Sequence, residues 1–107
     1  AEAVHSNGLD PILENIDQNS NVIICIDIDS MDPSITPNTI GRVPGGLSYF
    51  QVLNLIKGVA KKAKIEAIDF TEIMPEVDID GIGGLTVSRL IASTMGIIAR
   101  QKLNEKN

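Results

Sequence analysis

The sequence predicts an α/β fold in which two parallel strands are joined by a helical crossover. Residues 22–26 and 65–70 are rich in β-branched and apolar side chains, and an amphipathic helical stretch lies between them. Neither run alternates with polar residues, which is typical of strands buried on both faces of a parallel sheet. The order helix, strand, helix, strand, helix is that of a βαβ crossover with flanking helices, and such crossovers are right-handed.

The first half of the chain contains one predicted helix, one strand and one long loop. Residues 1–8 form a polar lead-in. Asp10-Pro11 is a helix start, with Asp as the N-cap and Pro in the first turn, and the apolar spacing predicts a helix to about residue 18. The strand at 22–26 follows. Residues 30–47 carry three prolines and three glycines, which predicts a long loop, and long ordered loops are often functional.

The second half begins with a helix whose start is clearly marked. Ser48 and Gln51 have the spacing of a capping box, and apolar residues follow at helical intervals up to Ala63. The second strand, 65–70, leads to Thr71-Glu72 and a loop over 74–84. A final helix is predicted over about 85–102. Because two apolar strands alone leave both sheet edges open, we expect this sheet to be part of a larger one.

Composition excludes several classes of function. The 107 residues carry a formal net charge of −5, which disfavours nucleic acid as a partner. There is one cysteine, Cys25, so no internal disulfide forms, and no apolar run is as long as a membrane span. The first ten residues are polar and do not read as a signal peptide. A cytoplasmic protein with no membrane partner is therefore expected.

Three aspartates follow the first strand. Because residues i and i+2 of a strand point to the same side, Asp27 and Asp29 are expected to project together at the carboxyl end of the strand, and Asp32 returns nearby after a short turn. Ligands bind at the carboxyl ends of parallel strands, and paired carboxylates suit Mg²⁺, Ca²⁺ or Mn²⁺. The alternative is structural, since Asp32-Pro33 is a good turn initiator without any metal.

Three ordered blocks resemble the ureohydrolases, the arginase and agmatinase family. Residues 25–33 read Cys-Ile-Asp-Ile-Asp-Ser-Met-Asp-Pro, which is similar to the family signature Ser-x-Asp-x-Asp-x-x-Asp-Pro. Pro37 and the Pro-Gly-Gly-Leu of residues 44–47 follow at the family's spacing. Residues 72–78, Glu-Ile-Met-Pro-Glu-Val-Asp, resemble its Glu-x-x-Pro-x-x-Asp block. The likeness is to the C-terminal half of the family only.

The resemblance implies a fold and a site. The fold would be a partial three-layer α/β/α sandwich, with residues 1–107 forming the C-terminal part of one domain whose N-terminal half is absent. In the family, the residues matching Asp27 and Asp29 bind two Mn²⁺ ions. Asp32 matches an aspartate that orients the site without binding the metal directly. Glu72 matches a residue that faces the substrate. Relatives assemble as homo-oligomers. The implied reaction is hydrolysis of a small cationic guanidino compound, agmatine or arginine, to urea and an amine.

The implied chemistry suits these residue types. Guanidinium is a poor electrophile, and a water bound by two metal ions is a strong nucleophile at neutral pH. A carboxylate such as Glu72 can accept paired hydrogen bonds from the planar cation and orient its carbon. Without the resemblance, Glu72 would read as an exposed acid at a strand end.

The chain departs from the family pattern at three places, two of which put the implied activity in doubt. Cys25 stands where the family has Ser, a benign exchange. Residues 38–42 read Asn-Thr-Ile-Gly-Arg where the family commonly has Gly-Thr-Gly-Thr-Pro, so that Arg42 either adds a cation near the substrate or points to solvent. The remaining family ligands, a His and an Asp-x-His-x-Asp block, are missing. The one histidine, His5, lies in the polar lead-in and is expected to be solvent-exposed.

Three hypotheses follow. The first is a fragment of a manganese-dependent ureohydrolase, inactive alone. The second is a haloacid-dehalogenase-type phosphatase, which also opens with a strand and Asp-x-Asp, although Met31 and the Pro-Gly-Gly-Leu block disfavour it. The third is a non-catalytic, degenerate homologue that serves as a structural subunit.

Overall fold

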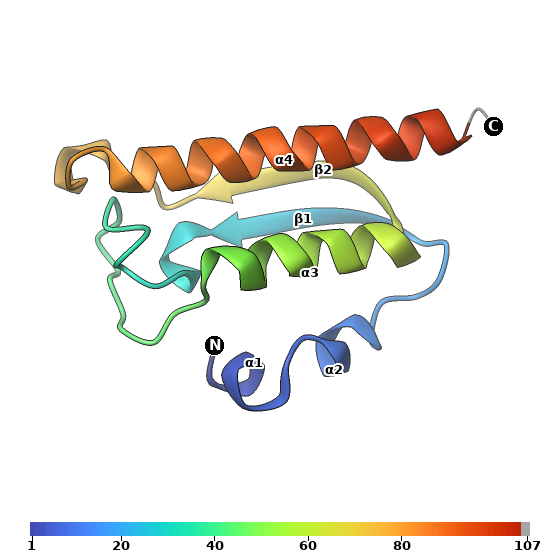
Figure 1. Cartoon of the computed structure of the whole chain (residues 1–107), viewed down its shortest axis with the longest axis horizontal. Helices are drawn as coiled ribbons and strands as arrows, with labels where there is room; N and C mark the ends of the chain where they lie inside the picture. The colour runs from blue at the N-terminus through green and yellow to red at the C-terminus, as the bar shows by residue number, and fades with distance from the viewer. Residues whose placement is uncertain (106–107) are drawn as a thin grey trace.

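The computed structural model describes residues 1–105 and shows a small parallel sheet with helices packed on it (Figure 1). Six main elements appear in the order α1, α2, β1, α3, β2, α4. Two short 3-10 turns, Ile28–Ser30 and Pro75–Val77, follow the two strands. The main elements are α1 Glu2–Asn7, α2 Asp10–Leu13, β1 Asn21–Asp27, α3 Tyr49–Lys62, β2 Lys64–Thr71 and α4 Ile82–Glu105.

The two strands are parallel, as the sequence predicts, and their register is fixed at both ends. Asn21 pairs with Lys64 and Asp27 with Thr71. The register shifts after Val22, because Val22 pairs with Ile65 whereas the next residue pairs with Ala67. The extra residue in β2 shifts the alternation of its side chains between the two faces by one position. Apolar side chains before and after the shift therefore reach the same face of the sheet.

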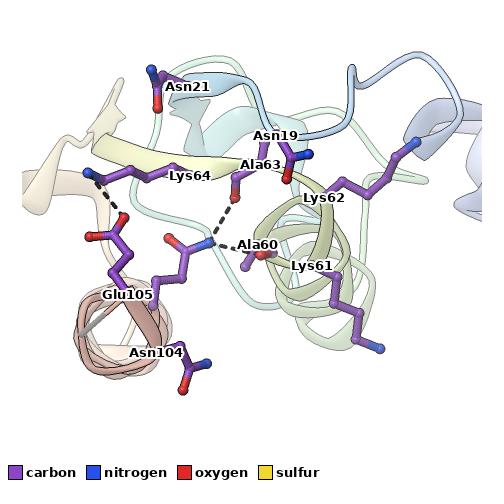
Figure 2. Close-up of a pocket in the computed structure, with 10 residues that line it drawn as sticks. Asn19, Asn21, Ala60, Lys61, Lys62, Ala63, Lys64, Asn104 and Glu105 are labelled. Carbon is purple, nitrogen blue, oxygen red and sulfur yellow. Dashed lines mark hydrogen bonds and ion pairs between the residues drawn. The ribbon is translucent and has the colours of Figure 1, made fainter. Parts of the chain in front are cut away.

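Helices cover one face of the sheet. Figure 2 shows α3 and α4 on the same side of the strands, and the core between them includes Ile26, Ile56 and Leu90. On the other face, Ile23 is 67% exposed, and Cys25 is exposed as well. The expectation that both strands are buried on both faces is therefore wrong for this chain, because its helices form one layer. The α/β class and the βαβ crossover are confirmed.

The helix predictions have mixed outcomes. The capping box that starts α3 is present: Gln51 N–H donates to Ser48 Oγ at 3.1 Å, and Ser48 N–H donates to Gln51 Oε1 at 2.9 Å. The helix predicted to reach residue 18 is wrong in length, since α2 ends at Leu13 and only turns follow. The lead-in is also wrong, because residues 2–7 form α1.

The last helix, α4, is longer than predicted and begins three residues earlier, at Ile82. By length and composition alone, this 24-residue helix could cross a membrane. The sequence was expected to contain no such segment. In the described chain, 28% of the apolar window of α4 is buried. Here α4 packs on α3 and β2, with Leu90 fully buried and Thr94 donating to the Leu90 carbonyl within the helix.

The turn between α3 and β2 is closed by one side chain of α4. Gln101 Nε2 donates to the carbonyls of Ala60 and Ala63, both at 2.8 Å, and its Oε1 accepts from Ile65 N–H. A pocket with a cavity volume of 480 Å³ lies at this end of the molecule (Figure 2). Lys64 at its edge pairs with Glu105 at 3.2 Å. This polar pocket lies at the amino ends of the strands, opposite to the aspartates, and its contacts are structural.

An apolar groove runs along the free edge of β1. It has a cavity volume of 650 Å³ and lies between β1, α2 and α3. Its lining includes Ile16, Ile24 and Leu55. Because β1 pairs with a strand on its other edge only, the backbone N–H and C=O groups on this edge have no strand partner among residues 1–105.

Candidate active site at the carboxyl ends of the strands

Asp27 is the last residue of β1, and Asp29 is the second residue of the 3-10 turn that follows, Ile28–Ser30. Between them Ile28 is fully buried. β1 ends at Asp27 and Asp29 lies in the 3-10 turn, so strand alternation does not extend to Asp29 and does not by itself place the two side chains on one side. Both aspartates nevertheless lie at the carboxyl end of β1, where β2 also ends.

Asp27 is held by the neighbouring strand. Thr71 lies opposite Asp27 in the parallel register, and the Thr71 hydroxyl donates a hydrogen bond to Asp27 Oδ1. Sequence reasoning missed this contact, because it depends on the register of two strands that are far apart in the chain. A hydroxyl-bearing residue immediately before Glu72 is the one local signal that could have suggested it.

Asp29 faces the loop that follows. A side chain at Gly41 would place its Cβ 3.0 Å from Asp29 Oδ2, which is tighter than an ordinary contact. The absence of a side chain at residue 41 thus leaves room for the Asp29 carboxylate. This packing brings residues 38–42, where the sequence departs from the ureohydrolase pattern, against one of the two predicted metal ligands.

Asp32 organises the loop. Its Oδ1 accepts from Ser34 N–H at 3.0 Å, and its Oδ2 accepts from Gly45 N–H at 3.1 Å. The hydrogen bonds from Ser34 are the main cause of a lowered pKa for the Asp32 carboxyl, and those from Gly45 and Gly46 add to the effect. Both carboxylate oxygens are engaged by the loop itself, which agrees with a supporting role for Asp32.

Glu72 follows β2 directly in an unusual backbone conformation. Its φ is +65°, in the left-handed region that non-glycine residues rarely adopt, and its side chain is exposed. Such a conformation costs on the order of 1–3 kcal/mol and persists only where the surrounding structure enforces it. The kink ends the strand and places a carboxylate at the same end of the sheet as Asp27.

The two loops that leave the strands are tied together. Met74 N–H donates to the Asn38 carbonyl at 2.7 Å. Arg42 Nε donates to the Pro37 carbonyl at 2.8 Å, and its Nη2 donates to the Val77 carbonyl at 2.6 Å. Arg42 therefore braces the loop after β1 against the loop after β2, a role that neither sequence interpretation of this residue anticipated.

Asp78, the last residue of the Glu-x-x-Pro-x-x-Asp block, secures the start of α4. Its carboxylate accepts from the backbone N–H groups of Ile79, Gly83 and Gly84 at 2.9–3.0 Å. Partial burial acts to raise the pKa of Asp78, but the three N–H donors outweigh it and lower the pKa. This aspartate is a capping group for the helix and supplies no free ligand.

His5 is exposed, as expected, but it is not free. Its Nε2 lies 3.2 Å from the Gly45 carbonyl and 3.1 Å from the Gly46 carbonyl, and its Nδ1 lies 3.2 Å from Gln51 Nε2. A neutral ring that donates from Nε2 and accepts at Nδ1 satisfies all three contacts. His5 thus connects α1 to the Pro-Gly-Gly-Leu loop and to the start of α3. The sequence did not predict these contacts, because His5 is about 40 residues away from its partners.

The described residues do not complete a metal site. Within residues 1–105 there is no group of three or more His, Cys, Asp or Glu side chains arranged to hold a metal ion. The donor type of Asp27 and Asp29 fits Mn²⁺, since carboxylates are among the ligands this ion prefers. Asp27 and Asp29 are two carboxylates at one strand end, and within residues 1–105 no third such side chain joins them to form a metal-binding group.

Comparisons with known proteins agree with the likeness seen in the sequence. A family model described as the arginase family matches residues 1–96. The chain is 33% identical over 99 residues to N(1)-aminopropylagmatine ureohydrolase of Thermus thermophilus, covering 91% of this chain and 32% of the relative. It is 36% identical over 85 residues to the mitochondrial arginase of Medicago truncatula, covering 76% and 25%.

The fold agrees as well. The crystal structure of a hypothetical agmatinase from Burkholderia thailandensis superposes with a TM-score of 0.82 at 27% identity, covering 100% of this chain and 34% of that one. The chain thus spans about a third of the length of the relatives it matches. The phosphatase hypothesis is wrong. The family match, the fold and the three sequence blocks agree, and the chain belongs to the arginase family.

Proposed function

We propose that residues 1–107 supply the C-terminal part of a ureohydrolase active site, which hydrolyses a small guanidino compound such as agmatine or arginine to urea and an amine. The observation that carries the proposal is the meeting of two family blocks at one end of the sheet: Asp27 pairs in register with Thr71, the residue immediately before Glu72. The ureohydrolase names of its relatives support the reaction class.

In this proposal Asp27 and Asp29 hold Mn²⁺, with further ligands coming from outside the described residues. The bound metal would supply a nucleophilic hydroxide at neutral pH. Asp32 keeps the loop after β1 in shape through Ser34 and Gly45, and it leaves the metal to the other two aspartates.

Glu72 is the proposed substrate-binding and catalytic carboxylate. Its exposed side chain at the end of β2 is free to accept paired hydrogen bonds from the guanidinium group, which orients the reacting carbon. The left-handed conformation of Glu72 supports this role, since strained backbone is tolerated where it aims a functional side chain.

The proposed partner of the chain is the remainder of the ureohydrolase domain. The free edge of β1 and the apolar groove beside it would receive a further strand, and the exposed Ile23 on the open sheet face would be buried by further structure. The chain covers about a third of its relatives, which leaves ample sequence for these elements in a protein of their length. Alone, the chain would release no urea.

The experiment grafts residues 1–107 into the matching third of the Burkholderia agmatinase and measures urea release from agmatine and arginine with Mn²⁺. We expect turnover by the chimera, none by the isolated chain, and a loss of about 10²-fold for Glu72→Gln, because a neutral amide no longer pairs with and orients the cation.

Glu76→Gln is the matched control, since Glu76 is an exposed acid in the same loop. Circular dichroism establishes that each chimera is folded. Rapid urea release by the isolated chain would contradict the proposed division of the site. A folded chimera in which Glu72→Gln behaves as Glu76→Gln would contradict the role of Glu72.

A further inference from the structure

We infer that Thr71 is a positioning residue for the metal ligand Asp27, and that its hydroxyl raises the affinity of the site for Mn²⁺. The inference rests on the proposed function, because it takes Asp27 to be a ligand. It adds a residue outside the three blocks that carry the family resemblance. The contact that carries it is the hydrogen bond from Thr71 Oγ1 to Asp27 Oδ1.

The backbone places the two side chains together. Asp27 and Thr71 are the last residues of their strands and are partners in the parallel register. Side chains of register partners point to the same face of a sheet. The pair therefore lies at the end of the sheet face that also carries the exposed Cys25, and no helix among residues 1–105 covers that face.

The hydrogen bond assigns different tasks to the two carboxylate oxygens. Oδ1 receives the Thr71 proton, which fixes the rotation of the carboxylate, and Oδ2 accepts no hydrogen bond from any residue in the described part of the chain. A ligand held in one orientation loses less side-chain entropy on binding a cation. Hydrogen-bonded partners of metal ligands typically contribute 10–100-fold to metal affinity.

Asp29 is restrained differently, and the difference isolates the effect of Thr71. Its carboxylate lies against Gly41, where a Cβ would come within 3.0 Å of Oδ2. Asp32 is fixed by two loop N–H groups. Of the three aspartates, Asp27 is thus the one whose orientation depends on a side chain from the other strand, and a change at Thr71 leaves the other two restraints in place.

The test measures Mn²⁺ affinity of the 107-residue chain, from the broadening of amide NMR signals on titration with MnCl₂, for four proteins. Thr71→Val keeps the shape of the side chain and removes the hydroxyl, whereas Thr71→Ser keeps the hydroxyl. Thr86→Val is the matched control, because the Thr86 hydroxyl bonds to the Ile82 carbonyl of its own helix. We expect Thr71→Val to weaken Mn²⁺ binding about tenfold, and Thr71→Ser and Thr86→Val to bind as the wild type does.

A merely structural role for Thr71 predicts another result: Thr71→Val would lower the denaturation midpoint and leave the Mn²⁺ affinity of the folded chain unchanged. That result overturns the inference while Asp27 remains a ligand. Wild-type protein in which Asp27 shows no Mn²⁺-dependent broadening overturns the inference, whereas the proposed function is decided separately by urea release from the chimera. If Thr71→Val does not fold, the rotamer of Asp27 in the wild type is measured instead, from the NMR scalar couplings of its side chain. A single Asp27 rotamer supports the inference, and averaging over several rotamers contradicts it.

Discussion

Glu72 combines a functional position with an unfavourable backbone. Among residues 1–105, its φ of +65° is one of three positive values at non-glycine residues, and the other two, at Asn19 and Asp80, belong to residue types that tolerate this region well. Glutamate has no such preference. Backbone preference therefore does not explain the glutamate at residue 72, whereas the proposed role of its carboxylate would explain it.

The cost of this conformation is measurable. Glu72→Asn is expected to stabilise the chain by up to about 1 kcal/mol, because asparagine adopts the left-handed region with less strain. Urea denaturation gives the free energy of unfolding. Glu76→Asn provides the comparison, since Glu76 has no positive φ. A Glu72→Asn protein that is less stable than the wild type would mean that the Glu72 side chain itself stabilises the fold.

At the residue scale, the sequence proposes the candidate residues, whose roles stay predictions, and it was insufficient for their contacts. Asp27, Asp29, Asp32 and Glu72 were identified from spacing and resemblance. The bonds that restrain them come from residues distant in the chain, such as Thr71 with Asp27 and His5 with Gly45. Arg42 shows the same limit: its brace to Val77 spans 35 residues, and no local pattern predicts it.

Among the elements, those with strong local signals were predicted well. The capping box located the start of α3, and apolar runs located both strands to within one residue. The start of α4 was misplaced because Gly83 and Gly84 read as loop residues. Their N–H groups are held by Asp78 in the folded chain, and Gly83 packs against the buried Asn38.

Replacing glycine with alanine is expected to have opposite effects on stability at two positions of α4. At Gly83 a Cβ would lie 1.9 Å from Oδ1 of Asn38, whose side chain is 1% exposed and has no room to move. Gly83→Ala should therefore destabilise the chain by about 1–3 kcal/mol through overpacking. At Gly96 nothing lies within 4 Å. Gly96→Ala should stabilise it by up to about 1 kcal/mol through helix propensity.

Thermal and urea denaturation of the two variants measure both effects in one helix. The pair serves as its own control, since the chemical change is identical and the environment differs. If Gly83→Ala were as stable as Gly96→Ala, the close approach of α4 to the loop after β1 would be wrong, and with it the packing that holds residues 38–42 beside Asp29.

On the scale of the whole molecule, residues 1–105 form a parallel α/β unit whose sheet is covered on one face, and we propose that it is part of a larger fold. Two strands and one layer of helices leave β1 with a free edge, an apolar groove beside it and an open sheet face. The sequence predicted an incomplete sheet from the number of strands, but which face would be open depends on how α3 and α4 pack together. Assembly into homo-oligomers and a cytoplasmic location stay predictions.

The preference for Mn²⁺ distinguishes the proposed enzyme from the degenerate homologue. Residues 1–105 bring no three metal-binding side chains together, so the chain offers a partial site. Under the proposed function, Asp27 and Asp29 would bind Mn²⁺ in preference to the other exposed acids of the chain. In a structural subunit without catalytic function, no such preference is required.

The most direct test of this account is a map of Mn²⁺ binding on the isotope-labelled chain, read from the paramagnetic broadening of each backbone amide. The account predicts broadening centred on Asp27 and Asp29, lost in Asp27→Asn and kept in Asp80→Asn, where an exposed acid outside the site is changed. Broadening spread evenly over the exposed acids, or unchanged by Asp27→Asn, would contradict it.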